Sequence, residues 1–352
     1  MVAMPRKHFR RHCLVANLFS SLITTRGDSR MNRRNMIAGS LASMLGTQLR
    51  AQGGNGYPHR PVTLIFPFPP GSPGDAEARE IGISMQKATG QPLVMDYRPG
   101  ASGIIGTQLA QRAAPDGYTL LYGSTTSIVT GPAVTMKSPY SGTTDFEPLT
   151  GIGRIDGLLV VPANSKYHTA QELAEALKAN PGKLNYGTIG PGSMSHLIGE
   201  LYLRTVGAKA TPVAYKGTPQ ALQALVAGEI DFLADSVASA GGLIDAGRVR
   251  PLAVATSKRL SQLPDVPTLT ETGLKLVLGV WLGLFAPKGT PRSVLDQWAL
   301  CASDYLRDAD VRSKLLARGI EPTPSTPQEF ARQVAADEAQ WRPLIRSLNI
   351  QT

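Results

Sequence analysis

Three short segments that are rich in glycine and hydroxyl side chains could bind a negatively charged group. They cover residues 68–74, 123–127 and 190–196. The first and the third precede helical patterns, and the free amides and the dipole at a helix N-terminus favour an anion. Serine and threonine hydroxyls can donate to the same oxygens. The alternative is that these residues only cap helices and form turns.

Two further residues extend this candidate anion site. Lys216 could supply a countercharge if it points inward, the alternative being a solvated turn. Asp235 directly follows a strand and would suit an amine or a hydroxyl group of a ligand. The complete set of candidate ligand-binding residues is Phe68, Pro70, Gly71, Ser72, Gly74, Ser124, Thr125, Thr126, Gly190, Gly192, Ser193, Ser195, His196, Lys216 and Asp235.

Residue patterns typical of catalysis are sparse beyond residue 51. Only His59, His168 and His196 occur there, and none has a histidine or cysteine at metal-ligand spacing. Neither the nucleophile-elbow pattern G-x-S-x-G nor a phosphate-binding P-loop occurs. We therefore expect no catalysis, no metal and no cofactor. An enzyme that uses His196 or Asp235 remains an alternative.

The N-terminal 51 residues have the pattern of an export leader. They carry a net charge of +8 out of +10 for the whole chain, so we expect no nucleic-acid partner. Two basic starts each precede an apolar run, and the second ends at a plausible cleavage site near Ala51. Met31 would make a natural start codon. Arg33 and Arg34 permit a twin-arginine route, while a general secretory signal is the safer prediction.

Cysteine use agrees with export to the bacterial periplasm. Cys13 lies in the leader, and Cys301 is the only cysteine beyond it. The mature chain therefore cannot form an intramolecular disulfide. Neither apolar run of the leader reaches the roughly 18 residues that a bilayer span requires.

Strand-like and helical patterns alternate beyond the leader, which predicts an α/β fold with mostly parallel sheets and helices on both faces. About 300 residues are enough for two domains. The first unit should be a strand from Val62, a turn, and a helix that Asp75 caps. Ala78, Ile81, Met85 and Ala88 should share the buried face of that helix.

Later elements follow from the same patterns. Residues 155–161 and 277–286 should be apolar strands, and residues 123–127 a hydroxyl-rich loop. Capping boxes should open helices at Thr169 and Thr326. Two helices should follow residue 291.

Motifs along nearly all of residues 57–350 resemble the Bug family, the periplasmic solute-binding proteins of tripartite tricarboxylate transporters. The motifs are Tyr57-Pro58-x-x-Pro61, Pro67-Phe68-Pro69, Arg98-Pro99-Gly100-Ala101, Pro115-Asp116-Gly117-Tyr118-Thr119-Leu120, Pro181-Gly182-Lys183-Leu184-Asn185-Tyr186, Tyr215-Lys216-Gly217, Leu263-Pro264-Asp265-Val266-Pro267-Thr268 and Ala286-Pro287-x-Gly289-Thr290-Pro291.

The resemblance implies a two-domain periplasmic-binding-protein fold of the Venus-flytrap type II, with the ligand in the cleft. It implies one lobe of residues 57–154 and 281–352 and a second of residues 155–280. The chain should cross between them near residues 152–161 and 277–286. The first loop and the glycine-rich loop of the second lobe should hold a ligand carboxylate.

The sequence departs from the family pattern in the first loop. Gly71-Ser72 stands where the family usually has Gly-Gly, and Pro73 lacks an N–H, so different amides face the ligand. We predict a monomeric periplasmic receptor that captures a small organic carboxylate and delivers it to membrane transporter subunits. A binding protein that serves a sensor kinase is the other candidate.

Overall fold

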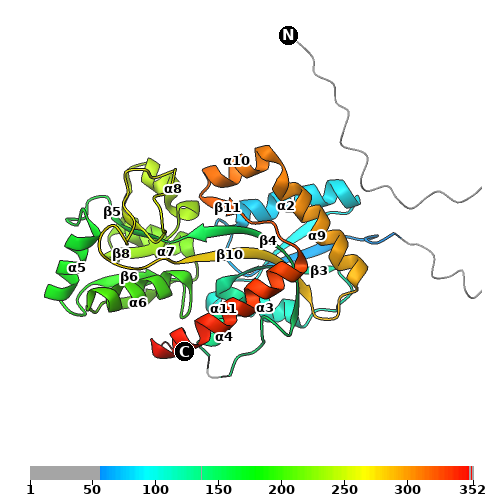
Figure 1. The fold of residues 1–352 in the computed structure, drawn as a ribbon, viewed down its shortest axis with the longest axis horizontal. Coiled ribbons are helices and arrows are strands. Elements are labelled where there is room, and N and C mark those ends of the chain that lie inside the picture. The colour runs from blue at the N-terminus through cyan, green and yellow to red at the C-terminus, as the bar shows by residue number, and fades with distance from the viewer. Residues whose placement is uncertain (1–55, 136, 349, 351–352) are drawn as a thin grey trace, which may run out of the picture. The chain divides into compact units, whose positions relative to one another are not determined.

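Two β-sheets form the framework of the computed structural model, which describes residues 56–135, 137–348 and 350. Both sheets lie in the compact unit Arg60–Thr352. The leader and its predicted cleavage site fall outside the described residues. Figure 1 shows the longest described strands, β4 and β10, lying side by side, and both belong to the six-stranded sheet.

The first sheet has six strands in the order β11-β4-β10-β3-β1-β2. Strands β1 and β2, and likewise β1 and β3, run parallel, whereas β10 is antiparallel to both of its neighbours. The six strands are β1 (Val62–Phe66), β2 (Leu93–Tyr97), β3 (Thr119–Ser124), β4 (Phe146–Asp156), β10 (Gly279–Pro287) and β11 (Ile320–Pro322).

The second sheet has five strands in the order β7-β6-β8-β5-β9. Strand β6 is parallel to β7 and β8, and β5 is antiparallel to β8 and β9. The strands are β5 (Leu158–Pro162), β6 (Asn185–Thr188), β7 (Thr211–Ala214), β8 (Phe232–Asp235) and β9 (Val249–Val254). The prediction of mostly parallel sheets is therefore wrong, because the strands next to the crossings run against their neighbours.

The chain passes from one sheet to the other at two adjacent points, which confirms the predicted crossings. Gly157 separates β4 from β5, so the expected single strand over residues 155–161 is in fact broken. The Gly157 amide donates to the Leu278 carbonyl at 3.0 Å, just before β10 begins. Ala255 joins both segments, since its amide donates to Gly157 at 2.7 Å and its carbonyl accepts from Leu278 at 2.8 Å.

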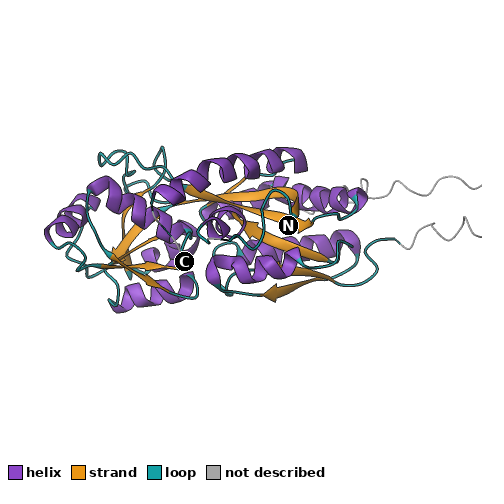
Figure 2. Cartoon of the chain, turned by 90° about the horizontal axis from the view of Figure 1, so that it is seen from below, coloured by secondary structure: helices purple, strands orange, loops and turns teal. Residues whose placement is uncertain are grey.

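Helices lie on both sides of the sheets (Figure 2). Around the first sheet they are α2 (Asp75–Thr89), α3 (Ile104–Gln111), α4 (Gly131–Ala133), α9 (Arg292–Arg307), α10 (Ala309–Ala317) and α11 (Pro327–Ser347), with short turns η1 (Ala101–Gly103) and η2 (Thr125–Thr130). Around the second sheet they are α5 (Ala170–Ala179), α6 (Met194–Val206), α7 (Thr218–Ala227) and α8 (Val237–Asp245).

Several helix predictions need correction. Three helices rather than two follow residue 291, and α8 was not predicted. Ala88 is exposed, although Ala78, Ile81 and Met85 are buried as expected. The capping box of Thr326 is confirmed, while the Glu172 carboxylate at the other predicted box accepts from the His168 amide instead.

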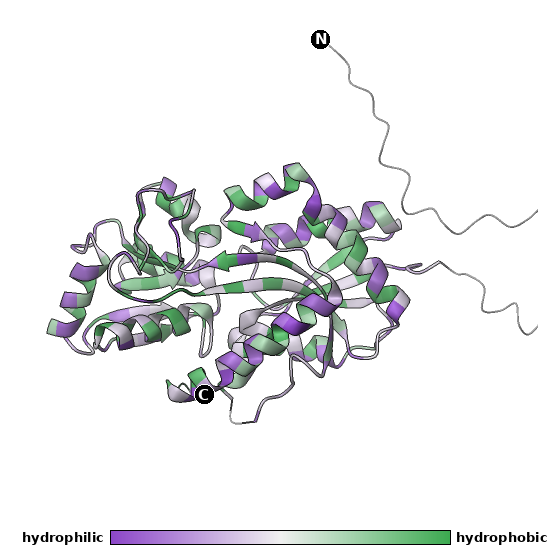
Figure 3. Cartoon of the chain, viewed as in Figure 1, coloured by the Kyte–Doolittle hydropathy of each residue, from purple (hydrophilic) through white to green (hydrophobic). Residues whose placement is uncertain are grey.

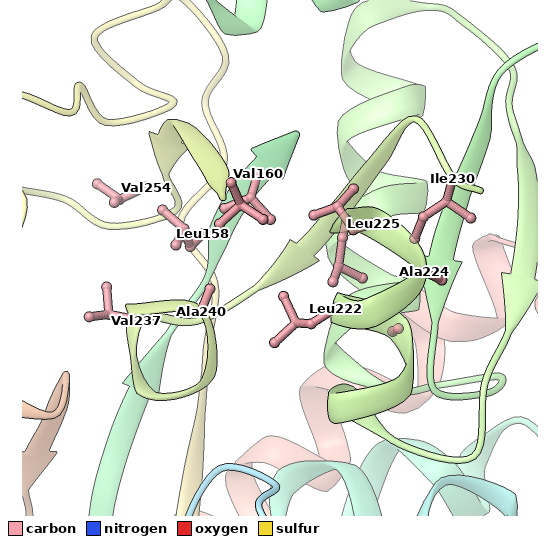
Figure 4. Close-up of a cluster of buried hydrophobic side chains, with 12 residues drawn as sticks. Leu158, Val160, Leu222, Ala224, Leu225, Ile230, Val237, Ala240 and Val254 are labelled. Carbon is pink, nitrogen blue, oxygen red and sulfur yellow. The ribbon is translucent and has the colours of Figure 1, made fainter. Parts of the chain in front are cut away.

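The second sheet has its own apolar core. Strand β5 contributes Leu158 and Val160, and α7 contributes Leu222 and Leu225, all of them almost fully buried (Figure 4). Apolar residues concentrate along the strands and the helix faces turned toward them (Figure 3). The burial of apolar surface therefore holds each strand end, and the loop that follows it, in a fixed place.

Candidate functional site

The first loop, residues 68–74, joins β1 to α2. Gly71 and Gly74 have φ angles of 78° and 87°, a region that glycine adopts without strain. A Cβ on Gly74 would lie 2.5 Å from the hydroxyl of Tyr122, so the loop can sit on β3 only because this residue is glycine. Phe68 packs edge to face on Phe66 with ring centroids 6.1 Å apart, and Pro70 is exposed.

Asp75 is the first residue of α2 and not its N-cap, which is Gly74. Its carboxylate accepts a hydrogen bond from the Gly71 amide at 2.8 Å and from the Tyr97 hydroxyl at 2.6 Å. Arg79 pairs with it at 3.1 Å. Burial alone would raise the pKa of Asp75, but the bonds from Arg79, Tyr97 and Gly71 hold it below its ordinary value. The Gly71 amide, which was expected to face a ligand anion, thus donates to the Asp75 carboxylate of the protein itself.

Replacing Asp75 with asparagine should lower the free energy of unfolding at pH 7 by about 2 kcal/mol, since hydrogen bonds to a buried charge are lost. The folded-state pKa is lowered, so the stabilisation exists above the ordinary pKa of 3.8 and disappears as pH falls through the folded value. Urea titrations of both proteins at pH 7 and at pH 3 measure this. An equal difference at both pH values would show that the charge is not responsible.

Ser72 differs from the other hydroxyl residues of the candidate site. Its side chain is buried, with 6% of the residue exposed. Its hydroxyl oxygen has no hydrogen-bond partner among the described residues. Buried polar groups in folded proteins nearly always have partners. The Ser72 hydroxyl is therefore a free donor within the first loop.

The hydroxyl-rich segment after β3 is not the loop that the sequence predicted. Ser124 ends β3, and residues after it form the buried π-helical turn η2. Ser124 and Ser127 cap this turn reciprocally. The Thr125 hydroxyl accepts from the Trp281 amide at 3.0 Å, and Thr126 is buried. Ser124 and Thr125 are thus engaged in fixing the turn against β10.

The second glycine-rich loop, residues 190–196, opens α6. Ser193 is the N-cap, and its hydroxyl accepts from the His196 amide at 3.3 Å. The Ser195 hydroxyl accepts from the Ile189 amide at 3.1 Å. Burial lowers the pKa of His196, although Glu200 opposes this from 3.8 Å, and its Nδ1 has no partner among the described residues. The serines therefore shape the loop.

This loop contacts the elements of the first sheet directly. The Ser102 hydroxyl donates to the Pro191 carbonyl at 2.8 Å, and the Thr130 hydroxyl donates to the Gly192 carbonyl at 2.6 Å. A Cβ on Gly190 would lie 2.8 Å from the Ser102 hydroxyl. Ser102 itself has a φ of 55°, which is unusual for a residue with a side chain.

The contacts give the glycines of the second loop a role that sequence reasoning missed. Gly190 and Gly192 allow two chain segments to approach closely. Neither Ser102 nor Thr130 was among the predicted site residues. Ser102 directly follows the motif Arg98-Pro99-Gly100-Ala101, which did not mark it as a site residue, and nothing local distinguished Thr130.

The two charged candidates lie in different surroundings. Lys216 is exposed, and its amide donates to Gln220 at 3.2 Å. Asp235 ends β8 and is buried, with 4% of the residue exposed. Its Oδ1 accepts from the Ser239 hydroxyl at 2.5 Å, whereas Oδ2 has no partner within the described part of the chain. The structure thus provides a buried acceptor at Asp235.

A groove of about 480 Å³ connects the first loop with the helices of the second sheet. Gly71 lines it on one side, and α7 and α8 supply most of the other. Its lining includes Ser239, the partner of Asp235, and one charged residue, Arg248. A groove with a single positive charge in its lining suits a small anion with an apolar body.

Two negative findings concern the described residues only. None of their His, Cys, Asp and Glu side chains gather in groups of three or more that could hold a metal ion. None of the helices in the described ranges combines the length and apolar character that crossing a membrane requires.

The chain matches the family "Tripartite tricarboxylate transporter family receptor" over residues 77–350. It belongs to this family. The resemblance to Bug proteins is thereby confirmed, and "Protein BugT" of Bordetella pertussis is 32% identical over 292 residues, covering 82% of this chain and 90% of that protein. A "UPF0065 protein" of Pseudomonas sp. (strain P51), from the tcbD-tcbE intergenic region, is 36% identical over 319 residues, 90% of this chain and 94% of that protein.

Solved structures of similar receptors confirm the fold. Rpa4515 of R. palustris, solved with adipate, is 32% identical with a TM-score of 0.81, covering 84% of this chain and 99% of that one. MatC of Rhodopseudomonas palustris, solved with bound malate, is 32% identical with a TM-score of 0.78, covering 82% and 100% of the two chains. The family is one of transporter receptors.

Proposed function

We propose that this receptor captures a small organic carboxylate between the loops of its two sheets and delivers it to transporter subunits. The observation that carries the proposal is a pair of buried polar atoms without partners among the described residues. The Ser72 hydroxyl comes from the first sheet's loop and Asp235 Oδ2 from the second sheet. Loops from both sheets also meet directly, through Ser102 and Thr130.

The class of ligand follows from the charges and from the relatives. Arg248 is the only charged residue in the lining of the groove. Two similar receptors hold the carboxylates adipate and malate. The Ser72 hydroxyl and the Arg248 guanidinium would favour a carboxylate on the ligand. We further propose that the protein acts in the periplasm as a monomer after residues 1–51 are removed.

A thermal-shift panel of mono- and dicarboxylates on refolded, ligand-free protein tests the anion. Ligand at 100 times its dissociation constant should stabilise the folded state by about 2.7 kcal/mol. Stabilisation only by amines, sugars or metal ions would contradict the proposal.

Replacing Ser72 with alanine should weaken binding of the best carboxylate at least tenfold, since a hydrogen bond to a charged group is lost. Isothermal titration calorimetry measures the affinities. The matched control is Ser84→Ala, because Ser84 is a half-buried serine of α2 outside the candidate site. Equal affinities of the two variants would show that the Ser72 hydroxyl does not bind the ligand.

A further inference from the structure

The environment of Asp235 consists of hydrogen-bond donors and lacks a positive charge. Oδ1 accepts from the Ser239 hydroxyl, and the Ser236 amide also donates to the carboxyl group. No ion pair joins Asp235 to any described residue. Burial raises the pKa of Asp235 to about 7, while the two donors act in the opposite direction.

Neither protonation state satisfies this carboxyl group within the protein. If Asp235 is ionised, Oδ2 is a buried acceptor without a donor. If Oδ2 is protonated, it is a buried donor without an acceptor, and if Oδ1 is protonated and donates to the Ser239 hydroxyl, Oδ2 is again a buried acceptor without a donor. The ionised form and the form protonated on Oδ1 both leave Oδ2 as an acceptor without a donor. The missing partner is therefore a donor from outside the chain.

Asp235 does not line the groove that the ligand is proposed to use, but its hydrogen-bond partner Ser239 does. The Ser239 hydroxyl, 2.5 Å from Asp235 Oδ1, belongs to a residue in the groove lining. Gly71 of the first loop lines the same groove. Asp235 is thus one hydrogen bond away from a groove that residues around both sheets line. It also lies at the carboxyl end of β8, the end of a strand where open α/β sheets bind ligands.

We propose that Asp235 is a specificity-determining residue that accepts a hydrogen bond from a hydroxyl or ammonium group on the ligand. The ligand class is then a hydroxy- or amino-carboxylate rather than a plain carboxylic acid. This inference rests on the proposed function, because it assigns one end of the same bound anion. A site built to pair with a ligand donor discriminates strongly against the analogue that lacks it.

Matched acids test the assignment. Succinate, malate and aspartate differ by a hydrogen, a hydroxyl and an ammonium group at one carbon, as do glutarate, 2-hydroxyglutarate and glutamate. Calorimetry at pH 8 should show that the wild type binds a donor-bearing member at least tenfold more tightly than its parent acid. The hydroxyl and ammonium arms identify which donor is used.

Asp235→Asn should reduce that preference to threefold or less, while the parent acid keeps its affinity within threefold. The matched control, Asp231→Asn, should retain the full preference, because Asp231 lies beside β8 but accepts from the Asn185 amide. If the parent acids bind the wild type as tightly as their substituted partners, the proposed role of Asp235 is wrong, while the proposed function stands. The same holds for a preference that survives Asp235→Asn. Failure of all six acids to bind would contradict the proposed function as well.

Discussion

Replacing Asp235 with asparagine should stabilise the ligand-free protein at pH 8 by roughly 2 to 4 kcal/mol. Burial raises the folded-state pKa from 3.8 to about 7, and each pH unit of difference corresponds to about 1.4 kcal/mol. The folded state therefore binds the proton more tightly than the unfolded state. The wild type loses stability as pH rises from about 4 to about 7, and the asparagine variant avoids that loss.

Urea unfolding at pH 8 and at pH 4 measures the effect, which should be near zero at pH 4 because Asp235 is then neutral in the folded protein. Asp231→Asn is the matched control, and it should lower stability at pH 8, since its carboxylate accepts from the Asn185 amide at 2.7 Å. An Asp235→Asn protein less stable than the wild type at pH 8 would show that the carboxylate serves the fold. Stabilisation is the expected result for a group kept at a cost for binding.

Replacing Gly192 with alanine should weaken carboxylate binding at least tenfold. A Cβ there would lie 2.6 Å from the Thr130 carbonyl and 2.9 Å from Val134 Cγ1, so the second loop could not keep its contact with the first sheet's elements. Small-angle X-ray scattering should show a larger radius of gyration for this variant. Affinity should fall because both loops must meet around the ligand.

Gly207→Ala separates this effect from backbone strain. Gly207 has a φ of 66°, close to the 72° of Gly192, but a Cβ on Gly207 would meet nothing within 4 Å. Both variants should lose about 1 kcal/mol of stability, because alanine is strained at positive φ. Only Gly192→Ala should change affinity and radius. Identical affinities for the two variants would mean that the Thr130 contact is not needed for binding.

Local patterns made much of the fold predictable. The strand, turn and helix around β1 and α2, and the capping box at Thr326, depend on residues close in sequence. Helix α8 was missed because its sequence contains Gly241 and Gly242, which have poor helix propensity, and packing on the sheet outweighs that preference. Strand direction was mispredicted because β4 and β10 pair over more than a hundred residues of chain.

The site was less predictable because its contacts, like those between β4 and β10, join residues that are far apart in the sequence. Glycine serves equally well to expose amides and to allow close approach, and the sequence cannot distinguish these uses. The partners of Gly190 and Gly192 are Ser102 and Thr130, far away along the chain. The predicted hydroxyls of Ser124, Ser193 and Ser195 have internal partners, whereas Ser72 and Asp235 retain unpaired atoms. Only the folded arrangement separates the two groups.

The paired crossing segments at Gly157 and Leu278 restrict how the halves of this receptor can move. The two segments are bonded to each other and share Ala255 as a common neighbour, so one cannot change its backbone torsions without the other. Sliding of one half past the other would break these bonds, whereas bending about a single axis across the two crossing segments would keep them. We therefore expect ligand entry to involve a swing about one axis, and a single distance between the two sheets should report it.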